Sequence, residues 1–112
     1  MEVYFVLDEQ GDPLPVSDND AWLQWFESAD RRVAQTMVTP DIAVLTIFSG
    51  VDEVTEGRSA RPFETRGFGG MLDGEEVRYP TRVDALAGHA KVVAWCRLGT
   101  SPGEGATEKQ IG

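Results

Sequence analysis

The sequence predicts an α+β fold: one antiparallel sheet of four to five strands with two helices on one face, in the order β-α-β-β-β-β-α. Several short runs of apolar and β-branched residues are bounded by turn residues, as strands are. Two longer stretches, residues 17–29 and 82–98, repeat apolar side chains at helical spacing. The connections between the four middle strands are of hairpin length, which favours antiparallel pairing.

The first strand is expected at residues 2–8, where apolar side chains occupy both faces. A strand of this kind suits a sheet that is covered on both sides. Residues 9–13 carry turn chemistry, and Pro13 and Pro15 stiffen the connection that follows.

The first helix is expected to begin at a Ser17 cap and to run to about Ala29. Asp20 lies three residues after Ser17, as in a capping box with a shorter acid. We interpret Trp22 and Trp25 as core residues rather than as a platform for ligand stacking, because both lie on the broad apolar face of the helix.

The remaining strands are expected at residues 32–38, 42–48, 63–69 and 75–79, the last at the sheet edge. Residues 42–48 are almost wholly apolar, which places them at the sheet centre. Residues 49–60 are polar and are expected to form a mobile loop. Gly67, Gly69 and Gly70 complete neither phosphate-loop motif, so a turn explains them better.

The last helix is expected over residues 82–98, with Thr81 as its cap and Asp84 at the third helical position. Gly88 in its middle costs ~1 kcal/mol relative to Ala, which makes sense if another segment of backbone crosses closely there. Residues 1–98 are expected to form a single domain, followed by a disordered tail over residues 99–112.

Two helices on one face leave the other face of the expected sheet uncovered. The first and third strands are nevertheless apolar on both faces. A second copy of the chain is the natural cover in a protein of this length, so the sequence predicts a homodimer.

The charge of −9 is concentrated at one end of the chain. Residues 1–30 hold eight acids and no Lys or Arg, and residues 31–112 hold eleven acids and ten bases, so the two segments carry −8 and −1. Such a surface repels phosphates, so direct nucleic-acid binding is not expected. It attracts basic proteins, including those that grip DNA or RNA.

Composition also indicates the cellular compartment of the protein. There is no apolar run of ~18 residues, so no membrane span is expected, and the first residues lack the features of a signal peptide. The single cysteine, Cys96, forms no disulfide within the chain. These observations predict a cytoplasmic protein.

The candidate partner-binding residues lie on the outward face of the first helix and just beside it. They are Asp18, Asp20, Leu23, Glu27 and Asp30. An apolar Leu inside an acidic rim is more typical of a protein-contact surface than of a catalytic one.

The sequence predicts no catalytic residue, metal or cofactor, and hence no enzyme. His89, the only histidine, has no orienting acid near it on its helix. Cys96 has no paired histidine, and no metal-binding motif is present. An alternative is a small-molecule or nucleotide site around the turn at residues 67–70. Its residues would be Glu64, Arg66, Tyr79 and His89.

Several motifs together resemble a family of small proteins of bacteriophages and prophage-bearing bacteria. The matching residues are Trp25-Phe26, Arg31 to Thr36, Phe63-Glu64-Thr65, Phe68-Gly69-Gly70, Tyr79, Thr81, and Ala85 through Gly88-His89. The likeness spans about residues 3–95, and Arg66 departs from it because the family has an apolar residue there.

The resemblance implies a phage origin and brings no catalytic residues with it. Small acidic phage proteins are often inhibitors of host machinery, and some block CRISPR or restriction complexes by covering nucleic-acid-binding surfaces. The leading hypothesis is therefore an acidic inhibitor of a basic host protein, such as a CRISPR or other defence nuclease complex, acting in the bacterial cytoplasm. A phage structural or assembly protein is a further alternative.

Overall fold

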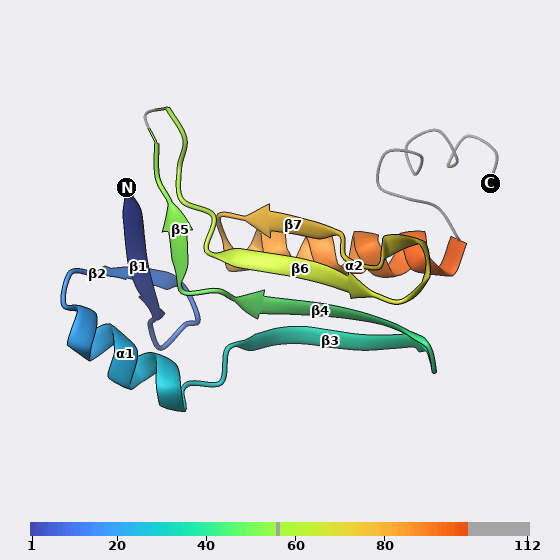
Figure 1. Cartoon of the computed structure of the whole chain (residues 1–112), viewed down its shortest axis with the longest axis horizontal. Helices are drawn as coiled ribbons and strands as arrows, with labels where there is room; N and C mark the ends of the chain where they lie inside the picture. The colour runs from blue at the N-terminus through green and yellow to red at the C-terminus, as the bar shows by residue number, and fades with distance from the viewer. Residues whose placement is uncertain (56, 99–112) are drawn as a thin grey trace.

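The computed structural model describes residues 1–55 and 57–98, which form two antiparallel sheets and two α-helices (Figure 1). The three-stranded sheet has the order β2-β1-β5, with β1 Glu2–Leu7, β2 Pro13–Val16 and β5 Val51–Glu53. The four-stranded sheet has the order β3-β4-β6-β7, with β3 Arg32–Thr39, β4 Ile42–Phe48, β6 Phe63–Phe68 and β7 Glu76–Tyr79. The helices are α1 Asn19–Ser28 and α2 Arg82–Leu98. The predicted α+β class is confirmed.

The arrangement of strands differs from the predicted single sheet because two short strands were read as connections. β2 contains Pro13 and Pro15, which lack an N–H and favour turns, yet an edge strand tolerates them. β5 lies inside the expected loop at residues 49–60. Gly50, with φ 79°, turns the chain from β4 in one sheet into β5 in the other.

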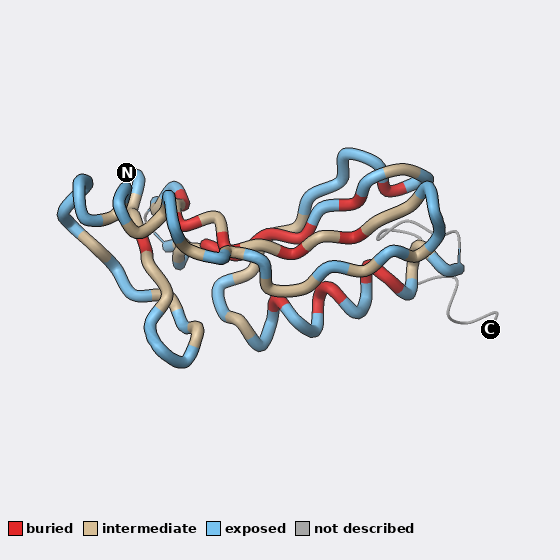
Figure 2. The backbone as a smooth tube through the Cα atoms, turned by 90° about the horizontal axis from the view of Figure 1, so that it is seen from below, coloured by how far each residue is buried: buried red, intermediate tan, exposed pale blue. Residues whose placement is uncertain are grey.

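Each helix covers its own sheet rather than sharing one face. α1 packs on β1 and β2, and α2 packs across all four strands of the larger sheet. Figure 2 shows α2 along one side of this sheet, with its buried residues turned towards the strands. No helix in the described part of the chain is long and apolar enough to cross a membrane.

A core of aromatic side chains joins the two sheets to α2. Phe5 of β1, Phe48 of β4, Phe63 of β6 and Ala85 of α2 form one buried cluster. A second cluster, Val44, Leu72, Val92 and Val93, lies further along the four-stranded sheet and α2.

The helix caps show one correction. Asp18, not Ser17, caps α1, because its carboxylate accepts hydrogen bonds from the amides of Asp20 (2.9 Å) and Ala21 (3.2 Å). The α2 cap is as predicted, since Thr81 Oγ1 accepts from the amide of Asp84 at 3.1 Å. The expected C-terminal cap Gly99 and the expected tail at residues 99–112 lie outside the described residues.

Gly88 is explained by a side chain rather than by a crossing backbone. The ring of Tyr79, at the end of β7, fills the space that a Cβ at Gly88 would enter. The missing side chain therefore lets the tyrosine lie between β7 and α2, which offsets the low helix propensity of glycine.

Gly88→Ala should lower the free energy of unfolding by about 1–3 kcal/mol, because the added methyl overpacks against Tyr79. The measurement is chemical denaturation followed by circular dichroism. In a Tyr79→Ala background the same change should be neutral or stabilising, since helix propensity then dominates. An equal loss in both backgrounds would contradict this packing account.

Candidate interaction surfaces

The acidic segment of the sequence becomes one end of the molecule. Residues 1–30 form β1, β2 and α1, which lie together at one end of the molecule (Figure 1). All eight of their acids are exposed. Of these eight acids, only Asp30 lies in ion-pair range of a base among the described residues, 3.9 Å from Arg32. In the described structure, the negative charge of this end is therefore almost entirely without a basic partner.

The five predicted partner-binding residues all lie at this end, but they differ in which of them already bond to the protein's own backbone. Asp20, Leu23 and Glu27 share the exposed outer side of α1, and Leu23 is 50% exposed. The carboxylate of Asp18 caps α1 by accepting a hydrogen bond from the amide of Asp20. Asp30 follows the helix and accepts from the amide of Arg32 at 3.1 Å. The first three are thus the side chains left to meet a partner.

The inner side of α1 packs against the first sheet and the core with partly buried side chains, although no residue of the helix is fully buried. Trp22 Nε1 donates to the carbonyls of Phe5 (2.9 Å) and Gly50 (3.1 Å), which ties the helix to the first sheet and to the turn between the sheets. The Trp25 ring meets the Phe48 ring edge-on at 5.7 Å. Both tryptophans are therefore structural.

A surface hollow of about 460 Å³ opens beside the start of α1. It is lined by Met1, Glu2, Val3, Tyr4, Pro15, Val16, Ser17 and Asn19. The hollow has mainly apolar walls, to which Glu2 adds one carboxylate.

The four residues of the alternative ligand site do not converge. Glu64 and Arg66 of β6 point to the side of the sheet away from α2, because the residues paired with Val44 and Thr46 point towards it. Tyr79 and His89 lie between the sheet and α2. The sheet itself therefore separates the two pairs of side chains.

His89 is held in a buried polar chain between α2 and the sheet. Its Nε2 lies 2.8 Å from Thr36 Oγ1, and its Nδ1 lies 2.8 Å from Thr46 Oγ1. Thr46 in turn shares a 2.5 Å hydrogen bond with Thr65. Burial lowers the pKa of His89, which favours the neutral ring. Both ring nitrogens are thus engaged in holding the helix on the strands.

Glu64 and Glu76 form a carboxyl pair on the opposite side of the sheet. Burial and the neighbouring Glu76 raise the pKa of Glu64, whereas the hydrogen bond from Glu64 lowers the pKa of Glu76. Arg66 lies 3.6 Å from Glu64 and 3.3 Å from Glu76. The two carboxyl groups thus lie beside one guanidinium, on a face that no described helix covers.

That uncovered face also exposes apolar side chains. Met37 of β3 is 58% exposed and Phe68 of β6 is 46% exposed, and both point away from α2. Large apolar side chains gathered on one face are a mark of an interaction surface. The prediction that a second copy covers this face stays a prediction.

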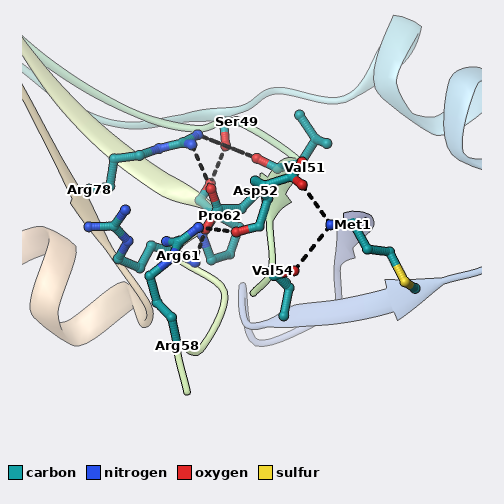
Figure 3. A network of polar contacts seen from close by, with 10 residues as sticks. Met1, Ser49, Val51, Asp52, Val54, Arg58, Arg61, Pro62 and Arg78 are labelled. Atoms are coloured by element: carbon teal, nitrogen blue, oxygen red, sulfur yellow. Dashed lines mark hydrogen bonds and ion pairs between the residues drawn. The ribbon is translucent and has the colours of Figure 1, made fainter. Parts of the chain in front are cut away.

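The junction between the two sheets is built on one buried acid, Asp52 (Figure 3). Its carboxylate lies 2.8 Å from Arg78 Nη1 and 3.2 Å from Arg58 Nη1, and it accepts from the amide of Arg61 at 2.7 Å. Arg78 also donates to Ser49 Oγ at 2.9 Å. One carboxylate of β5 thus ties the first sheet to β7 of the second and to the segment before β6.

The charge state of Asp52 follows from these contacts. Burial alone would raise the pKa of Asp52, but the amide of Arg61 and the charges of Arg78 and Arg58 outweigh it and hold the pKa below its usual range. The sequence gives no sign of this cluster, since Asp52 and Arg58 lie in the predicted loop at residues 49–60 and Arg61 follows it directly. Only the fold brings Arg78 to it.

Cys96 and the metal-ligating side chains are the remaining residues of chemical interest. Cys96 is partly buried against the second core cluster, and burial raises the pKa of its thiol. Across residues 1–55 and 57–98, no three side chains of the metal-ligating types lie close enough together to hold a metal ion.

Comparison with known proteins finds no match among family models, curated proteins or solved structures. Function is therefore argued from the surfaces described above.

Asp52→Asn should lower the free energy of unfolding by about 2–4 kcal/mol, because it leaves the Arg78 and Arg58 guanidinium groups without their counter-charge. The measurement is thermal or chemical denaturation at neutral pH. Glu53→Gln is the matched control, since Glu53 is exposed and its ion pair with the N-terminus is exposed as well. Equal effects of the two changes would refute the structural role of Asp52.

His89 should make the protein less stable as the pH falls from 7 towards 5. Its pKa is lower in the folded chain than the usual 6.5, so the unfolded chain binds a proton that the folded chain resists. The measurement is the free energy of unfolding against pH, and His89→Gln should flatten the curve in this range.

Glu64→Gln is the control, because it removes another group with a shifted pKa, on the other side of the sheet, and leaves His89 in place. The folded-state pKa of Glu64 is raised, so its contribution to stability falls as pH rises, opposite in sign to that of His89. Parallel curves for wild type and His89→Gln would contradict the assignment.

Proposed function

We propose that this chain is a protein-binding inhibitor whose acidic end covers a basic surface of a host protein. One observation carries the proposal: residues 1–30 place eight acids on the surface of one end, whereas residues 31–98 hold nine acids and nine bases. The charge is thus separated in space rather than spread over the molecule for solubility.

Electrostatics favours a basic partner. A field from eight nearly unpaired carboxylates reaches about 10 Å at 0.1 M salt and steers a cationic surface towards this end. Proteins that grip nucleic acid expose such surfaces to bind phosphates. Carboxylates held there would occupy the same groups and compete with DNA or RNA.

The acidic end also offers apolar contact. Leu23 stands half exposed between Asp20 and Glu27, and the hollow beside α1 has mainly apolar walls. An apolar centre within a polar rim is the usual anatomy of a protein interface. A surface that served only to keep the protein soluble would not require the exposed leucine or the apolar hollow.

The partner class that we propose is a nucleic-acid-handling complex of the bacterial cytoplasm, such as a CRISPR or restriction nuclease. The basis is the phage resemblance of the sequence together with the acidic end. The alternative ligand-binding function has less support, because the sheet separates Glu64 and Arg66 from Tyr79 and His89.

Neutralising the outer side of α1 should weaken partner binding. Asp20→Asn combined with Glu27→Gln should lower the affinity roughly tenfold and reduce its dependence on salt, because two long-range attractions are lost. The measurement is capture of bacterial proteins on immobilised chain at low salt and at about 0.5 M salt. The captured partner's nucleic-acid binding is then assayed with and without the chain.

The matched control is Asp41→Asn combined with Glu75→Gln, which removes the same charge from exposed residues outside the acidic end. It should leave capture and competition close to those of wild type. Equal losses for both double variants, or a captured partner that binds nucleic acid just as well in the presence of the chain, would refute the proposal.

A further inference from the structure

The larger sheet ends in a strand whose outer side is free within the described residues. β7 pairs with β6 and with no other described strand. A free strand edge presents backbone donors and acceptors that accept another strand. The other side of β7 is therefore available for pairing.

The backbone direction along β7 follows from one hydrogen bond. The amide of Gly67 donates to the carbonyl of Glu75 at 3.2 Å, so the β6 ladder uses Glu75 and then alternate residues of β7. The N–H and C=O groups of Glu76 and Arg78 consequently point away from β6. Pro80 has no N–H, which ends the free edge there.

A groove runs beside this edge, between β7 and α2, with a volume of about 410 Å³. It is lined by Val77, Tyr79, Asp84, Ala87, Gly88, Lys91 and Trp95. The helical residues among them form one stripe on α2, with Asp84 and Lys91 at either side of the small pair Ala87 and Gly88.

We propose that the occupant is a second copy of this chain, bound by antiparallel pairing of its β7 with this β7 about a two-fold axis at Val77. Residues on the same face of a sheet lie opposite each other, so this register places Glu76 opposite Arg78 of the second copy, and the reverse. The same register brings the outward N–H and C=O groups of both residues together. The two four-stranded sheets then form one continuous sheet.

The charges of β7 favour this register, in which Glu76 and Arg78 of the two copies add to the ion pairs that they make with Arg66 and Asp52. Moving the axis to Arg78 places that arginine opposite its own copy, and like charges in that position are unfavourable. A strand whose charges complement itself after a two-fold rotation suits an isologous dimer. The charges of an unrelated peptide would not complement those of β7 by symmetry.

The charges of α2 are compatible with the same symmetry. The rotation that relates the two β7 strands makes the two α2 stripes antiparallel, so the Asp84 end of each stripe is turned towards the Lys91 end of the other. Ala87 and Gly88 lie midway between these two charges in the sequence. The strand edge and the helix stripe thus specify the same partner.

The grooves must contribute contact area as well. A stable interface buries about 800 Å² on each partner, which is more than an edge of four residues supplies. Val77, Tyr79 and Trp95 provide apolar surface beside the edge. The interface involves no residue of the acidic end, so it goes beyond the proposed inhibitor function and does not depend on it.

The test measures self-association by sedimentation velocity and amide hydrogen exchange by NMR. Wild type at about 100 μM should be a dimer, and the amides of Glu76 and Arg78 should exchange more slowly as concentration rises. Glu76→Pro should weaken dimerisation at least tenfold, because it removes an outward N–H that β6 does not use.

Matched variants separate the backbone, the charges and the other face. Glu76→Ala keeps the N–H and should weaken the dimer less than Glu76→Pro. Lys91→Glu should weaken it, and Lys91→Glu combined with Asp84→Lys should restore it. Phe68→Lys changes the uncovered sheet face and should leave the dimer intact.

Circular dichroism confirms that each variant is folded. The proposal is overturned if wild type stays monomeric at this concentration. A dimer that survives Glu76→Pro but is lost in Phe68→Lys also overturns it and assigns the interface to the uncovered face.

Discussion

The two-sheet architecture depends on a single buried carboxylate. Asp52 of β5 is only 4% exposed, and it holds Arg78 of β7, Arg58 and the amide of Arg61 around it. Asp52 belongs to the three-stranded sheet and Arg78 to the four-stranded one, so their ion pair fixes how the sheets meet. The aromatic core of Phe5, Phe48 and Phe63 then seals that junction. A buried acid is tolerable here because cationic and amide donors surround it.

The two faces of the larger sheet are chemically different. The face towards α2 is sealed by apolar clusters and by His89, whose ring links Thr36 and Thr46 of two strands. The opposite face carries the Glu64 and Glu76 pair beside exposed Met37 and Phe68. The polar groups of the first face hold α2 on the strands, whereas on the second face Arg66 and Glu76 are partly exposed and Glu64 is buried.

The surfaces proposed for binding lie in separate places, so one molecule has room for two kinds of contact. The acidic end is formed by β1, β2 and α1, and the β7 edge belongs to the other sheet. A dimer built through β7 would therefore present two acidic ends. Two such ends bound to neighbouring basic sites gain affinity by avidity without any new contact.

The sequence by itself determined the α+β class, α2 with its Thr81 cap, the edge position of β7 and the concentration of acids in residues 1–30. These follow from local periodicity, capping chemistry and charge counts, which depend on near neighbours alone. Only the tertiary structure decided the split into two sheets, the Asp52 cluster, the threonine partners of His89 and the separation of Glu64 from Tyr79. Each of these features depends on residues that are distant in the chain. Which strands pair, which side chains are buried and which face of the sheet each side chain occupies are set by long-range contacts, and no local sequence pattern encodes them.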